Sequence, residues 1–117
     1  MAASIRLAAA ALIVSCWVCA ARSADDLTTA DLMEACRSPA GSHGDRACSI
    51  FIGGFAAGLA TQRLLQIHGH AICLPVTDPL AQSRQTIQAF ADTHPELRDT
   101  GAAQVATEAL LRAFPCH

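Results

Sequence analysis

The sequence predicts a small all-α domain of about four helices, braced by two disulfides and preceded by a signal peptide. Three observations support this prediction. Beyond an apolar N-terminal run, apolar residues recur at the three- and four-residue spacing of helices. No segment alternates clearly enough to predict a strand. Four cysteines follow that run, an even number that is typical of paired disulfides in a small exported domain.

Residues 1–23 have the organisation of a secretory signal peptide, although the sequence does not choose among cleavage after Ala20, Ala21, Ser23 or Ala24. One basic residue, Arg6, precedes a short apolar run, and small residues follow it. The run is too short to favour a membrane-spanning helix, although an uncleaved signal anchor is an alternative. A second alternative is a lipoprotein, because the four residues ending at Cys16 resemble a lipobox. We expect export to the periplasm, an exported domain over residues 24–117, and membrane attachment only if Cys16 is lipidated.

The charge of residues 24–117 argues against two classes of partner. This part of the chain has six scattered arginines and no lysine against ten acidic residues, a formal charge of −4. It contains neither tyrosine nor tryptophan. Nucleic acids and anionic membranes favour basic clusters, and single strands also favour stacking aromatic residues. We therefore expect no nucleic acid and no membrane surface as partner.

The first two helices are predicted from their start signals. Thr28 or Thr29 is expected to cap a short helix that ends near Cys36. Turn-forming residues predict a loop over residues 38–45. The longest helix is expected over residues 46–68, with a broad apolar surface that includes Ile50.

Glycines inside that long helix need a reason, since each costs about 1 kcal/mol relative to alanine. Gly54 and Gly58 lie four residues apart and share a face, which lets another backbone approach closely. One interpretation is close packing within the bundle. The other is a homodimer face at Gly54 and Gly58.

The last two helices form the predicted hairpin. Asp78 and Pro79 begin the first of them, and His94-Pro95 ends it. Asp99 or Thr100 is expected to cap the second, with Gly101 in its opening turn and Pro115 after its end. The outer side of the first is expected to carry solvated polar residues, namely Arg84, Gln85, Gln88 and Asp92.

The helical layout favours one pairing of the cysteines. Cys36 and Cys48 flank the first loop, while Cys73 and Cys116 lie at one end of the hairpin. Of three connectivities, Cys36–Cys48 with Cys73–Cys116 needs the least distortion, although spacing alone leaves the other two open.

We predict no catalytic, cofactor or metal site. His68 and His70 precede Cys73 at a spacing that resembles a metal site, but an oxidised Cys73 cannot supply a thiolate ligand. No Ser-His-Asp set with recognisable spacing is present, and no two acidic residues share a helical face as a catalytic pair. The protein is therefore not expected to be an enzyme.

The order of motifs along the exported domain is also informative. A short helix ends in Cys36, an aromatic and glycine-rich helix follows Cys48, and Cys73-Leu74-Pro75 comes next. A helix then ends in His94-Pro95-Glu96-Leu97-Arg98, and the last helix ends at residues 109–116, Ala-Leu-Leu-Arg-Ala-Phe-Pro-Cys. This order resembles the Tai/Rap family of immunity proteins from type VI secretion systems.

The resemblance implies a periplasmic inhibitor, often a homodimer, that binds a secreted peptidoglycan-cleaving amidase. A rigid surface loop would enter the amidase groove and block it sterically. By that analogy the partner-binding residues are His94, Glu96, Arg98 and Asp99, in the turn between the last two helices. One alternative is that this turn only connects the helices. Another is an envelope adaptor or structural protein without a toxin partner, which would use the Gly54 and Gly58 face for self-association.

Overall fold

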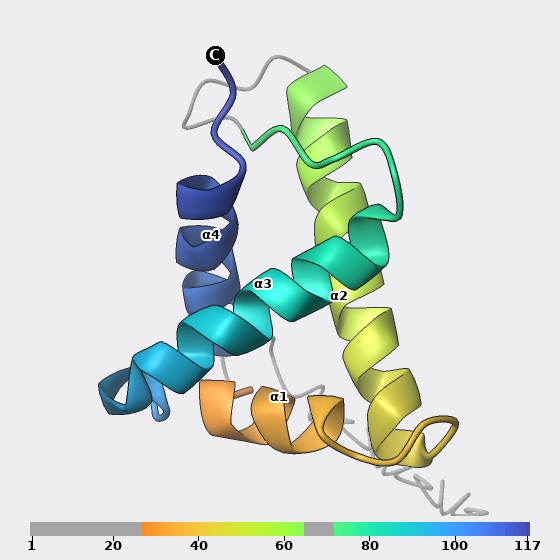
Figure 1. Cartoon of the computed structure of the whole chain (residues 1–117), viewed down its shortest axis with the longest axis vertical. Coiled ribbons are helices and arrows are strands. Elements are labelled where there is room, and N and C mark those ends of the chain that lie inside the picture. Colours follow the sequence, from red (N-terminus) through yellow and green to blue (C-terminus); the bar gives the residue numbers. More distant parts are fainter. Residues whose placement is uncertain (1–26, 65–71) are drawn as a thin grey trace, which may run out of the picture.

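The computed structural model describes residues 27–64 and 72–117. The predicted signal peptide, Cys16, His68 and His70 lie outside these residues. The described part contains α1 (Thr29–Cys36), α2 (His43–Leu64), α3 (Pro79–Thr93), the short 3₁₀ helix η2 (Pro95–Leu97) and α4 (Ala102–Ala113) (Figure 1). Only isolated β-bridges accompany them there, so the all-α prediction is confirmed. None of the described helices combines the length and hydropathy of a membrane span.

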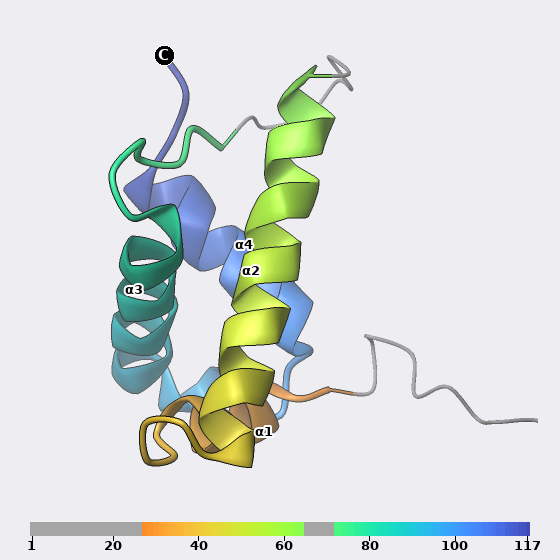
Figure 2. The ribbon, with the colours of Figure 1, turned by 90° about the vertical axis from the view of Figure 1, so that its right-hand side faces the viewer.

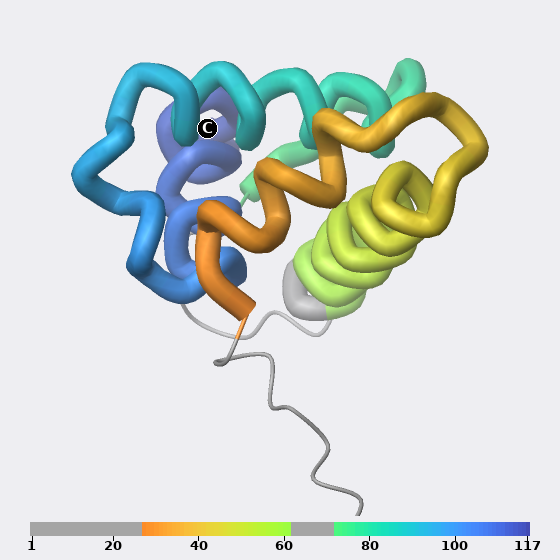
Figure 3. The backbone as a smooth tube through the Cα atoms, turned by 90° about the horizontal axis from the view of Figure 1, so that it is seen from below, coloured from red at the N-terminus to blue at the C-terminus, as the bar shows by residue number. Residues whose placement is uncertain are grey.

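The four helices pack around one core. In Figure 1, α2 and α4 lie on opposite sides, and α3 runs obliquely in front of them from the α4 side to the α2 side. Figure 2 shows α2 and α3 side by side in the view from the right, with α4 behind them. Helix α1 lies across the lower end and packs on all three other helices (Figure 3). The short helix therefore closes the end of the bundle at which the α3–α4 turn lies.

One face of each helix packs into the core. Its fully buried larger side chains include Ile52, Ile87, Val105 and Leu110. On α2, Ile52 lies one turn after Cys48, whose disulfide to Cys36 directs that face toward α1. The prediction that Ile50 belongs to the apolar packing surface is wrong, because Ile50 lies on another side of α2 and is 75% exposed. The disulfide, rather than the density of apolar residues, identifies the buried face.

Two helix starts agree with the prediction. Thr28 caps α1, with its hydroxyl accepting a hydrogen bond of 3.1 Å from the Asp31 amide. Asp78 caps α3, and Pro79 occupies the first helical position.

The other two helix starts differ from the prediction. Helix α2 begins at His43 rather than Arg46, because the Ser42 hydroxyl accepts a hydrogen bond of 3.3 Å from the Asp45 amide and caps it. Helix α4 is preceded by Gly101, not capped by Asp99 or Thr100. The Ala102 amide instead donates to the Leu27 carbonyl at 2.8 Å, so a distant backbone group replaces the expected side-chain cap.

The structure contains both expected disulfides, Cys36–Cys48 and Cys73–Cys116. The second is supported by a hydrogen bond of 2.8 Å from the Cys73 amide to the Phe114 carbonyl. It lies near the C-terminus, at the end of the hairpin opposite the α3–α4 turn (Figure 1). The two bridges therefore brace different ends of the bundle.

Candidate functional site

The turn between α3 and α4 is fixed from outside by the start of α1. The Ala30 amide donates to the Arg98 carbonyl, and the Thr29 amide donates to the Thr100 carbonyl, each at 2.8 Å. The Thr29 hydroxyl also donates to Thr100, at 2.9 Å. Together with the bond from Ala102 to Leu27, these contacts hold both sides of residues 98–102. The nearest brace of this turn is therefore the backbone of residues 27–30, not the Cys73–Cys116 disulfide.

The turn also has internal order. Its residues 95–97 form η2, and the Leu97 amide donates to the His94 carbonyl at 3.0 Å. The Thr100 amide in turn donates to the Leu97 carbonyl at 3.0 Å. A backbone that is ordered before binding loses less conformational entropy when a partner docks. The turn is thus a preformed surface element.

His94 has a structural role at the end of α3. Its ring stacks on Phe90 with centroids 4.1 Å apart. Its Nδ1 atom lies 2.8 Å from the Phe90 carbonyl, which only accepts, so this nitrogen carries the hydrogen and donates it. The half-buried His94 therefore shapes the turn, and it is the least exposed of the four predicted partner-binding residues.

The other three predicted residues are exposed on the turn. The Arg98 side chain is 71% exposed and that of Asp99 is 92% exposed. Their closest approach, from Arg98 Nε to Asp99 Oδ1, is 3.9 Å, which leaves the terminal amino groups of Arg98 without a partner in the described part. Glu96 is also exposed and belongs to η2. The structure thus groups Glu96, Arg98 and Asp99 as accessible charges on a fixed backbone.

A groove of about 600 Å³ lies beside this turn, between α1 and the end of α3. It is lined by Thr29, Ala30, Met33, Glu34, Arg37, Ser38, Ala91, Asp92, Pro95 and Arg98. An ion pair between Arg37 and Asp92 joins its two walls. The sequence prediction missed this groove, because helical spacing does not show that α1 packs against the end of α3. The one feature of the sequence that could have pointed to the groove is the placement of residues 30, 33, 34 and 37 on one face of α1.

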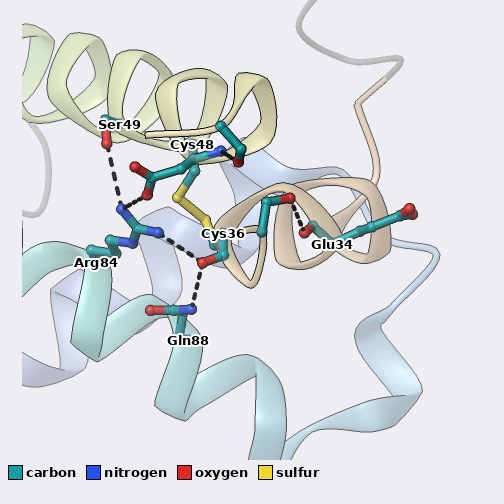
Figure 4. Close-up of a disulfide and its surroundings, with 9 residues drawn as sticks. Glu34, Cys36, Cys48, Ser49, Arg84 and Gln88 are labelled. Carbon is teal, nitrogen blue, oxygen red and sulfur yellow. Dashed lines mark hydrogen bonds and ion pairs between the residues drawn. A yellow bond between two sulfur atoms is a disulfide. The ribbon is translucent and has the colours of Figure 1, made fainter. Parts of the chain in front are cut away.

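Arg84 also differs from its prediction as a solvated outer residue. Its guanidinium donates to the Cys36 carbonyl at 2.7 Å and pairs with Asp45 at 2.8 Å (Figure 4). Figure 4 also shows Ser49 and Gln88 directed at the same cluster. A hydrogen bond from the Gly41 amide and then one from Arg84 hold the pKa of Asp45 below its ordinary value. The cluster stabilises the loop between α1 and α2.

Metal-binding chemistry has no support in the part of the chain that the structure describes. Across residues 27–64 and 72–117, no group of three or more His, Cys, Asp or Glu side chains is placed to hold a metal ion. The four cysteines of these ranges are paired in disulfides.

The fold and the site define a class of protein, a small disulfide-braced helical domain that presents a preformed charged turn. The sequence profile of the Rap1a immunity proteins matches residues 28–116, and the chain belongs to this family. The family consists of immunity proteins, which act against a secreted effector protein and are generally not enzymes. This agrees, at the level of the family, with the resemblance to Tai/Rap proteins. No curated protein and no solved structure matches the chain significantly.

Proposed function

We propose that the protein is a periplasmic immunity protein that binds a peptidoglycan-cleaving amidase delivered by a type VI secretion system and blocks it sterically. Family membership supports the immunity role, and the resemblance to Tai/Rap proteins supports the amidase as target. One observation carries the mechanism. The turn exposes Glu96, Arg98 and Asp99 while its backbone is hydrogen-bonded to residues 27–30.

The rigidity of the turn suits steric inhibition. A flexible loop would lose conformational entropy on entering a cleft, whereas this turn is already ordered by contacts with α1. Exposed charges on such a turn steer association and fix its orientation in a cleft of complementary charge. His94 would contribute by stacking on Phe90 and holding the start of the turn.

Export to the periplasm is part of this proposal. Residues 1–23 would be removed as a signal peptide, leaving residues 24–117 as the mature domain. Two disulfides within about a hundred residues favour an oxidising compartment.

A homodimer is a further part of the proposal. Gly54 and Gly58 are exposed, and a Cβ atom added at either would meet no other described residue within 4 Å. Close packing within the bundle, one of the two explanations for these glycines, is therefore wrong. A second copy on this face would account for both residues.

Periplasmic co-expression with a candidate peptidoglycan-cleaving amidase of a type VI secretion system tests the proposal. We expect relief of lysis and a complex that co-elutes in size-exclusion chromatography. A double variant, Glu96→Arg with Asp99→Arg, should weaken both effects, whereas Glu108→Arg on α4 should not. If the wild-type chain neither relieves lysis nor forms a complex, the amidase-inhibitor role is lost, and an envelope adaptor or structural protein becomes the better explanation.

A further inference from the structure

The groove beside the turn combines an apolar floor with a charged rim. Met33 is 4% exposed and Ala91 is 9% exposed, and Ala30 and Pro95 continue this apolar lining. The rim carries Glu34, Arg98 and the Arg37–Asp92 ion pair. Such a lining favours an occupant that is apolar at its centre and charged at one end.

Arg98 determines which charge is favoured at the charged end of the occupant. Its backbone is fixed, because its carbonyl accepts from Ala30 and its amide donates to Pro95 at 3.3 Å. Its terminal amino groups have no acceptor among the described residues. A planar guanidinium with a free fork matches a carboxylate, which it can bind through two parallel hydrogen bonds.

The remaining rim charges orient the occupant. Arg37 is neutralised by Asp92, so it does not compete for a carboxylate. Glu34 carries a carboxylate without an ion-pair partner in the described part of the chain, and it repels a second acid nearby. The acidic group of an occupant is therefore favoured at the Arg98 end and disfavoured beside Glu34.

The groove also sets the length of the occupant. It follows α1 from Ala30, next to Arg98, to Arg37, which is seven residues further along the helix. At 1.5 Å per residue this is roughly 10 Å. An extended chain rises about 3.3 Å per residue, so roughly three residues span the groove. The Arg37–Asp92 ion pair joins the two walls of the groove in its Arg37 half.

We propose that this groove binds an extended segment of the effector, about three residues long, with an apolar side chain on Met33 and Ala91 and a carboxylate on Arg98. The inference rests on the proposed function, because the occupant belongs to the effector that the turn contacts. The interface then has two halves. The turn enters the effector, and the groove receives a segment from it.

Calorimetric titration of the mature chain with the inactivated candidate amidase of the co-expression test probes the groove. Arg98→Glu reverses the charge at the carboxylate end and should weaken binding by roughly 30-fold or more. Ala30→Trp fills the groove from α1, outside the turn, and should weaken binding by roughly 10-fold or more. The matched controls are Glu108→Arg and Ala113→Trp, at accessible positions of α4, a helix that contributes nothing to the groove. They should change affinity by less than about 3-fold.

The outcomes separate this inference from the proposed function. Circular dichroism first establishes that each variant is folded. If the wild type binds and both groove variants bind equally well, the groove proposal is overturned while the inhibitor role stands. If Arg98→Glu weakens binding but Ala30→Trp does not, the turn alone carries the contact and the groove proposal again fails. Absence of binding by the wild-type chain overturns both.

Discussion

Arg84 on α3 donates a hydrogen bond of 2.7 Å to the carbonyl oxygen of Cys36, the last residue of α1. The same guanidinium pairs with Asp45 in the first turn of α2. One side chain therefore ties together three helices around the Cys36–Cys48 disulfide.

Replacing Arg84 by methionine is expected to lower the free energy of unfolding by about 1–3 kcal/mol. The variant keeps the apolar stem but leaves the Cys36 carbonyl and the Asp45 carboxylate without this donor. The Arg84 side chain is only 25% exposed, so water replaces the lost bonds incompletely. Urea denaturation measures the change. The control Arg112→Met removes an exposed pair with Glu108 and an exposed cation–π contact with Phe90, and should cost no more than about 1 kcal/mol. Equal losses in both variants would contradict a special role for Arg84.

Stability is expected to fall in acid partly through Asp45. Because the folded-state pKa of this carboxyl lies below its ordinary value of 3.8, its contribution is fully present above pH 3.8. It is lost as the pH falls through the depressed folded pKa, when protonation weakens the bonds from Gly41 and Arg84. Urea midpoints measured at decreasing pH should show this loss. Asp45→Asn should be less stable than the wild type near neutral pH. Below pH 3.8 it should lose less stability than the wild type does. If the stability of Asp45→Asn falls with decreasing pH as steeply as that of the wild type, Asp45 does not contribute to the acid sensitivity.

Replacing Ser83 by alanine is expected to stabilise the protein. Its side chain is fully buried in α3, and its hydroxyl has no hydrogen-bond partner within residues 27–64 and 72–117. An unpaired buried polar group costs about 1–3 kcal/mol, and serine is also a weaker helix former than alanine. Ser83→Ala should therefore raise the thermal midpoint. Ser42→Ala is the matched control, because that hydroxyl caps α2 and its loss should cost about 1 kcal/mol. Destabilisation by Ser83→Ala would indicate that the hydroxyl is satisfied in solution.

Local signals in the sequence predicted much of the fold. Thr28 and Asp78 cap their helices as expected, because a cap depends on residues within one turn of it. The order of the helices favoured the disulfide pairing that the structure contains, since the cysteines flank a short loop and a hairpin.

Contacts between distant segments could not be predicted from the same signals. Helix α4 starts at Ala102, whose amide donates to the Leu27 carbonyl. The Arg84 guanidinium is held by the Cys36 carbonyl at the end of α1. The groove requires the packing of α1 against the end of α3, which no periodicity encodes. The turn was a correct place to look for accessible charges, but the reason for its rigidity lies in residues 27–30.

The two disulfides are expected to contribute unequally to stability. The Cys73–Cys116 bridge spans 43 residues of chain and the Cys36–Cys48 bridge spans 12. On the chain-entropy model these separations correspond to about 4 and about 3 kcal/mol. Replacing Cys73 and Cys116 by serine should therefore lower the thermal midpoint markedly. Because the turn is held by α1, affinity for the effector in the folded variant should change little. A large loss of affinity would show that the distant bridge controls the turn after all.

The glycines of α2 are expected to respond oppositely to alanine. A Cβ on Gly44 would lie 2.7 Å from the Ser38 Cβ, so Gly44→Ala forces the loop and α2 apart and should destabilise the protein. Gly54 and Gly58 face open space, so alanine at each should stabilise the monomer by about 0.5–1 kcal/mol through helix propensity. If a second copy packs on this face, Gly54→Leu should also dissociate it, because a large side chain prevents close approach. Analytical ultracentrifugation at several concentrations measures the association. A dimer that persists unchanged in Gly54→Leu would place the contact between copies elsewhere on the molecule.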